Sequence, residues 1–192
     1  MCTAISHGRS AAAKLFATIE RVPTIDSEDP SGEKPADVQG EIVLEHIKFT
    51  YPSRPNVPII KDLSIKFEAG KTSALVGDSG SGKSTVVSLI ERFYDPLEGS
   101  VKLDGRDLKT LNVKWLRGQI GLVSQEPTLF ATTIRGNVEH GLIGTPWEHA
   151  SNDEKLKIVK EACIKANADV FISKLPLGYD TMVGDRYIQF YV

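Results

Sequence analysis

The stretch GDSGSGKST, residues 77–85, decides the fold of this chain. It lies between two apolar runs, SALV (73–76) and VVSLI (86–90), and it ends in Lys-Ser-Thr. Residues 77–84 match the phosphate-binding pattern G-x-x-x-x-G-K-[ST] at every fixed position. The pattern predicts a short buried strand before the loop and a helix from Lys83 to about Phe93.

Each part of the loop has a chemical task in holding a triphosphate. Glycine permits the unusual backbone angles that turn successive N–H groups inward, and the following helix presents the positive end of its dipole. Lys83 would neutralise β- and γ-phosphate charge, Ser84 would offer its hydroxyl to Mg²⁺, and Thr85 would lie near the α-phosphate. The alternative is a Gly/Ser-rich turn with a chance lysine. The predicted binding residues of the loop are Gly77, Asp78, Ser79, Gly80, Ser81, Gly82, Lys83, Ser84 and Thr85.

The composition is that of an ordinary globular protein. The chain has 192 residues, 41% of them apolar and 25% charged, which suits one domain with an extension. A net charge of −2 gives no electrostatic argument for a nucleic-acid partner. The two cysteines, Cys2 and Cys163, indicate a reducing compartment, and Cys163 is expected to be a small buried apolar group. No apolar run approaches the ~20 residues of a membrane helix.

The N-terminal part is expected to lie outside the compact domain. Residues 10–22 have helical composition, with an apolar stripe at Ala12, Leu15, Phe16 and Ile19. Residues 23–39 carry prolines, glycine and acids, which indicates a flexible linker before a domain that begins near Gly40. A mitochondrial presequence is an alternative interpretation of the acid-free start.

The remaining elements are predicted from alternation, turn residues and caps. Residues 120–126 are predicted to form an apolar strand like that at 72–77. In the last helix, one face is expected to carry Leu156, Val159, Cys163 and Ala166. The expected elements are strands at 41–51, 59–70, 72–77 and 120–126, a hairpin at 99–111 turning at Asp104-Gly105, and helices at 112–119 and 151–167 capped by Asn112 and Ser151.

Several motifs in a fixed order identify a family. FTYPSR (49–54), the phosphate loop, SQEPTLFATTIRGNV (124–138) and LPLGYDTMVGD (175–185) together resemble the nucleotide-binding domain of ATP-binding-cassette exporters. The likeness runs from about residue 41 to 186 and is strongest to the multidrug-resistance (P-glycoprotein-like) subfamily. It implies an α/β P-loop NTPase fold of the ABC type, with an antiparallel β part, a partial RecA-like core and a partial helical subdomain. Residues 1–22 resemble the cytoplasmic end of the last transmembrane helix of such an exporter.

The resemblance also implies residue roles. Tyr51 matches the aromatic residue that stacks on adenine, and Arg54 and Ile59 complete that pocket. Without the phosphate loop, Tyr51 would be interpreted as a surface aromatic at the end of a strand. Gln125 matches the glutamine that reaches Mg²⁺ or the attacking water, so the expected catalytic residues are Gln125 and Lys83 and the expected Mg²⁺ residues are Ser84 and Gln125.

Three features of the family are not found in these 192 residues. The Leu-Ser-Gly-Gly-Gln signature does not follow residue 186, no apolar run ends in Asp-Glu, and no histidine lies downstream of that point. We assign no role to His7, His46, His140 or His149. The sequence therefore predicts a partial ATP-binding domain at 40–186, with an aberrant tail at 187–192, in a truncated product or gene model.

Four functions remain open at this stage. By resemblance the domain is an ATPase that works with a transmembrane domain and a second nucleotide-binding domain, on the cytoplasmic face of a membrane, to drive solute export. The absent motifs favour instead an Mg·ATP-binding fragment with negligible hydrolysis, a regulatory fragment that docks on an intact exporter, or an unstable product. An adenylate-kinase-like enzyme would need a lid and an acceptor site, neither of which the sequence indicates.

Overall fold

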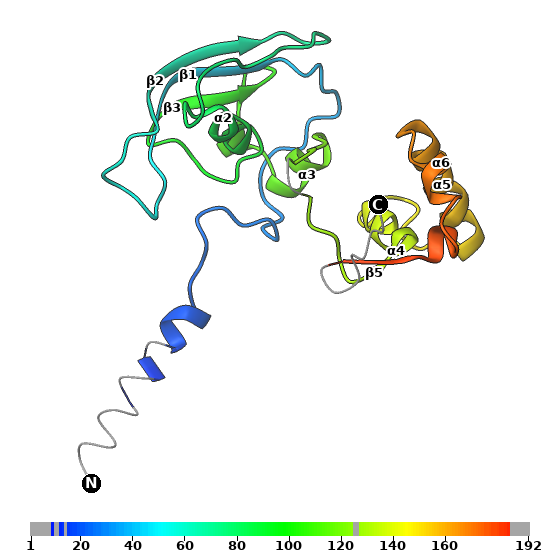
Figure 1. The fold of residues 1–192 in the computed structure, drawn as a ribbon. Helices are drawn as coiled ribbons and strands as arrows, with labels where there is room; N and C mark the ends of the chain where they lie inside the picture. Colours follow the sequence, from blue (N-terminus) through cyan, green and yellow to red (C-terminus); the bar gives the residue numbers. More distant parts are fainter. Residues whose placement is uncertain (1–8, 10–11, 14, 125–126, 185–192) are drawn as a thin grey trace. The chain divides into compact units, whose positions relative to one another are not determined.

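The computed structural model describes residues 9, 12–13, 15–124 and 127–184 (Figure 1). It divides into two compact units, Met1–Leu122 and Val123–Val192, which are described separately. The first unit is built around an antiparallel sheet and the second is mainly helical. The chain is thus of the α/β class, as the resemblance implied.

Four antiparallel strands form the sheet of the first unit. In spatial order they are β2 (Ile60–Phe67), β1 (Ile42–Phe49), β3 (Glu98–Leu103) and β4 (Arg106–Asp107). β3 and β4 form the predicted hairpin, and Asp104 (φ 50°) and Gly105 (φ 79°) make its turn. Two successive residues with positive φ match the twist of a tight hairpin.

One helix covers the sheet and directly follows the phosphate loop. Helix α2 (Lys83–Ile90) confirms the expected helix start and lies beside the sheet (Figure 1). Its Val86 and Leu89 are buried in the same hydrophobic core as Leu44 and Ile47 of β1. Burial of such side chains stabilises the fold by roughly 1.5–3 kcal/mol each. The sheet therefore fixes the first turn of α2, and with it the end of the loop.

The helix between the hairpin and the second unit is fixed by residues that are close to one another in sequence. The 3-10 helix η1 (Leu108–Thr110) leads to α3 (Val113–Gly118), where Asn112 Oδ1 accepts a hydrogen bond from Trp115 N at 2.9 Å. This confirms the predicted cap. Leu116 of α3 is fully buried in the core of the unit.

Two predicted strands are absent from the described part of the chain. Residues 72–77 and 120–124 have no strand conformation, and Val76 and Val123 are 94% and 96% exposed. The prediction of buried strands here is wrong for this structure. A strand needs a hydrogen-bonded neighbour, and no described segment pairs with either stretch.

The predicted linker is partly fixed. Glu33 N donates to Thr110 O at 2.9 Å, and Asn112 Nδ2 donates to the carbonyls of Asp29 and Ser31. Residues 29–33 are therefore tied to the start of α3, which corrects the expectation that the whole segment is flexible.

The helical unit has its own small core. Val159 and Cys163 of α5 (Asn152–Lys165) pack with Ile172 of α6 (Asp169–Ile172), so Cys163 is buried and free as expected. Ala166 is exposed and does not share that buried face, because α5 ends at Lys165. The other elements are β5 (Thr132–Thr133), α4 (Ile134–Glu139), η2 (His140–Leu142), η3 (Gly178–Asp180) and β6 (Met182–Val183).

Part of the predicted N-terminal helix lies in the described residues. Residues 15–19 are helical, and Leu15, Phe16 and Ile19 are all exposed. Among the helices of the described residues, none has both the length and the apolar character to cross a bilayer.

Candidate functional site

The loop from Gly77 to Gly82 folds around the ammonium group of Lys83. Lys83 Nζ donates to Gly77 O at 2.8 Å and to Asp78 O at 2.7 Å. Gly80 (φ 82°) and Gly82 (φ 89°) adopt left-handed backbone angles that glycine accepts without strain. The loop thus surrounds one positive charge with its own carbonyl groups. An anion that bound the Lys83 ammonium would replace these carbonyls as its hydrogen-bond acceptors.

The N-terminus of α2 is open to an acceptor. Its cap residue is Gly82, no described side chain caps it, and its first turn has no acidic residue. The first N–H groups of a helix have no acceptor within the helix, and the dipole favours an anion beside them. Donors, dipole and the Lys83 ammonium therefore all suit phosphate oxygens.

A cavity of about 360 Å³ opens at this loop. Five predicted binding residues line it together: Ile59, Gly77, Ser81, Gly82 and Lys83. Its other lining residues are Ile60, Lys61, Asp62, Leu63, Leu75, Val76 and Val86. Ligand pockets of proteins commonly have volumes of roughly 300–1,000 Å³.

The remaining loop residues do not line this cavity. Asp78, Ser79, Gly80 and Ser84 are exposed. Ser84 directly follows Lys83 on the first turn of α2. Thr85 is only 4% exposed. A hydroxyl on this turn is a suitable ligand for a magnesium ion that also binds phosphate oxygens.

The ring of Tyr51 is held in place by protein contacts. Its hydroxyl is 2.9 Å from Thr85 Oγ1, and its ring meets Phe49 and Tyr94 edge-to-face at centroid distances of 5.0 and 5.3 Å. Tyr51 is half-buried, so it is not a free surface aromatic at the end of β1.

Of the residues predicted to bind the base, Tyr51 and Arg54 do not line the cavity, and one predicted catalytic residue lies outside the described structure. Arg54 is exposed in the loop after β1, where its backbone N–H donates to the Tyr51 carbonyl at 2.9 Å, and its side chain does not line the cavity. Gln125 lies outside the described residues, so its predicted catalytic and metal-binding roles stay predictions.

Sequence reasoning missed the aromatic neighbours of Tyr51. Phe49 and Tyr94 belong to β1 and to the segment after α2, and only the fold brings them together. The available signal was the alternation of Phe49 and Tyr51, which places both side chains on the same face of an extended segment.

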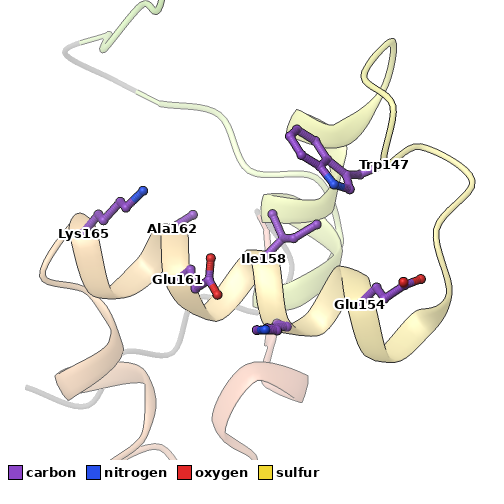
Figure 2. Close-up of a pocket in the computed structure, with 7 residues that line it drawn as sticks. Trp147, Glu154, Ile158, Glu161, Ala162 and Lys165 are labelled. Atoms are coloured by element: carbon purple, nitrogen blue, oxygen red, sulfur yellow. The ribbon is translucent and has the colours of Figure 1, made fainter.

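A larger hollow lies on the helical unit. It measures about 530 Å³ and lies along the exposed face of α5, with Trp147 above Ile158 (Figure 2). Its charged residues, Glu154, Lys157, Glu161 and Lys165, are of mixed sign, as on a solvated helix face. It includes none of the predicted site residues, and we assign it no function.

Comparison with known proteins gives consistent matches. The family model "ABC transporter" matches residues 60–186. An ABC multidrug transporter, MDR1, of Cryptococcus neoformans var. grubii is 68% identical over 183 residues, which is 95% of this chain and 13% of that protein. The ABC multidrug transporter mdr1 of Aspergillus fumigatus is 54% identical over 95% of this chain and 14% of that protein.

A solved structure shows the same fold. A bacterial Atm1-family ABC exporter with ATP bound superposes with a TM-score of 0.77 and 34% sequence identity, covering 95% of this chain and 30% of that one. The chain spans about 13% of the length of the first of the curated relatives above.

Proposed function

Because this chain belongs to the ABC transporter family and carries the nucleotide-binding domain of a multidrug exporter, we propose that residues 77–85 bind the triphosphate of Mg·ATP. The supporting observation is the position of Lys83 Nζ, which donates to two carbonyls of the loop at the mouth of a cavity beside the uncapped start of α2. Phosphate oxygens would replace these carbonyls as the hydrogen-bond acceptors of the Lys83 ammonium. The amides of the loop and of the first turn of α2 would donate to the same oxygens.

Each of the other predicted residues would contact a different part of the nucleotide or its metal ion. Ser84 would hold Mg²⁺ with its hydroxyl, and Thr85 would lie beside the α-phosphate. Tyr51 would stack on adenine, with Ile59 in the cavity wall. Arg54 would reach the base only if its exposed side chain moves toward it, because it does not line the cavity. Gln125, which lies outside the described residues, would complete the metal and water site. Mg²⁺ supplies charge neutralisation of the phosphates when it is bound.

These 192 residues bind ATP without efficient hydrolysis. The sequence has neither an apolar run ending in Asp-Glu nor a Leu-Ser-Gly-Gly-Gln segment. Phosphoryl transfer depends on groups positioned around the metal, the water and the γ-phosphate, so the missing groups remove most of the catalytic effect. In the family's whole transporter, which is membrane-bound, this domain would act with a transmembrane domain and a second nucleotide-binding domain to couple hydrolysis to export.

Binding is tested on the full 192-residue chain by thermal unfolding with and without Mg·ATP. At 100 times the dissociation constant, the nucleotide should stabilise the wild type by ~2.7 kcal/mol. Lys83→Ala should lose this stabilisation, whereas Lys114→Ala, on an exposed position of α3, should keep it. No shift of the wild type at millimolar Mg·ATP would contradict the proposal.

Hydrolysis is tested separately by phosphate release. We expect turnover well below ~1 s⁻¹, at the bottom of the usual range of enzymes. Turnover above that value that disappears in Lys83→Ala would show that the chain is catalytically competent and would overturn the second half of the proposal.

A further inference from the structure

Three aromatic rings from separate parts of the chain contact one another next to α2. Phe49 ends β1, Tyr51 follows two residues later, and Tyr94 follows the end of α2. The Phe49–Tyr51 and Tyr51–Tyr94 ring planes are at 82° and 87°, and the Phe49–Tyr94 centroids are 5.6 Å apart. Edge-to-face pairs at such distances are attractive beyond the area that they bury. Each ring therefore restricts the rotation of the other two.

A hydrogen bond restricts the far end of Tyr51. Its hydroxyl lies 2.9 Å from Thr85 Oγ1, which is buried in the first turn of α2. A buried hydroxyl needs a partner within the protein, and Tyr51 supplies it. The ring plane is thus set by two perpendicular neighbours, while the hydroxyl sets the direction of the side chain.

We propose that Tyr94 is a positioning residue for nucleotide binding: its ring holds Tyr51 in the plane on which a purine base stacks, and Thr85 links this platform to the turn that follows the phosphate loop. The inference rests on the proposed function. A ring that is ordered before the base arrives loses less conformational freedom on binding, so more of the stacking energy appears as affinity.

Tyr94 is the member of the cluster that allows a clean test. Phe49 is only 2% exposed and belongs to the sheet core, so its replacement would disturb the fold. Tyr94 is half-buried, and within the described residues its hydroxyl has no hydrogen bond. Tyr94→Phe therefore keeps the ring contacts, and Tyr94→Leu removes them while keeping an apolar side chain.

The experiment compares the affinities of the full chain for Mg·ATP and for inorganic tripolyphosphate, measured by titration calorimetry. Tyr94→Leu should weaken Mg·ATP binding about 2- to 10-fold, as expected for the loss of one edge-to-face pair, and leave tripolyphosphate binding unchanged. Tyr94→Phe should match the wild type for both ligands. In a Tyr51→Ala background, where the platform is gone, Tyr94→Leu should have no further effect.

The outcomes separate this inference from the proposed function. A wild type that binds neither ligand overturns both. A wild type that binds both, with an unchanged affinity ratio in Tyr94→Leu, overturns the positioning role alone, and so does an equal loss for both ligands. Should Tyr94→Leu fail to fold, Tyr94→Met decides, because it also removes the ring contacts while keeping an apolar side chain: the ATP affinity should fall relative to tripolyphosphate, and an unchanged ratio overturns the inference.

Discussion

Asp104 connects the start of β1 to the turn between β3 and β4. Its carboxylate accepts hydrogen bonds from the backbone N–H groups of Gln39, Gly40 and Glu41, at 2.8, 3.1 and 2.9 Å. Partial burial of the carboxyl opposes ionisation, but the bonds from Glu41, Gln39 and Gly40 together lower the pKa of Asp104 below its usual 3.8. The ionised form is therefore favoured in the folded state.

The first prediction concerns Asp104 and pH. Since the folded pKa lies below the unfolded one, the stabilisation is complete well above pH 3.8 and is lost as the pH falls through the folded pKa. Asp104→Asn, which tolerates the same positive φ, should lower the free energy of unfolding at pH 7 by ~1 kcal/mol. The difference from the wild type should shrink as the pH is lowered from 5 to about 3.

Urea unfolding at a series of pH values measures this effect. Asp37→Asn, at an exposed position of the same region, is the matched control and should change little. A difference between the wild type and Asp104→Asn that stays constant over this pH range would contradict the assignment of the hydrogen bonds to the ionised carboxylate.

At the scale of elements, the helix α5 is defined by its own first turn. Ser151 N donates to Glu154 Oε2 at 2.9 Å, and Glu154 N donates to Ser151 Oγ at 3.4 Å. This reciprocal pair satisfies two groups that the helix start would leave free. The Ser151 side chain and then its backbone N–H lower the pKa of the Glu154 carboxyl.

The second prediction follows from this cap. Ser151→Ala should destabilise the first turn of α5 by ~1 kcal/mol, seen as about fivefold faster amide hydrogen exchange at residues 154–156. Ser173→Ala, on an exposed serine after α6, should leave those amides unchanged. Equal exchange in Ser151→Ala and the wild type would show that packing alone holds the turn.

The elements that the sequence predicts well carry local signals. Asn112 and Ser151 cap their helices, and Asp104-Gly105 turns the hairpin, because each feature depends on residues only a few positions apart. The phosphate loop is recognised for the same reason. The contact of Tyr51 with Tyr94 joins residues 43 positions apart and could be found only from the fold.

The strand predictions at 72–77 and, within the described residues, at 120–124 failed for the opposite reason. Their apolar composition is typical of buried strands, but a strand forms only against a partner. In the described part of the chain, no amide group of 72–77 or 121–124 donates to a backbone carbonyl.

The third prediction is that these two segments exchange their amide hydrogens rapidly. Residues 72–76 and 121–124 should exchange close to the rate of an unstructured peptide, while the paired amides of β1 and β2 are protected. Hydrogen–deuterium exchange resolved by residue measures this. Protection equal to that of β2 would show that both segments pair as strands in solution.

At the scale of the whole molecule, the chain contains two units, and each has a hydrophobic core of its own. The unit up to Leu122 has a sheet, a helix and the candidate nucleotide site, and the unit from Val123 has a small helical core around Val159 and Cys163. The proposed nucleotide contacts within the described residues all belong to the first unit. Binding should therefore stabilise that unit most directly.

The most direct test of the central claim maps the backbone amides of the whole chain by NMR during titration with Mg·ATP and with inorganic tripolyphosphate. The account predicts that both ligands cause their largest amide shifts at residues 77–85, and that only ATP also shifts Phe49, Tyr51 and Tyr94. Shifts that leave the amides of Gly77, Gly80 and Gly82 unchanged at saturation would contradict it, because the loop would then not hold the phosphates.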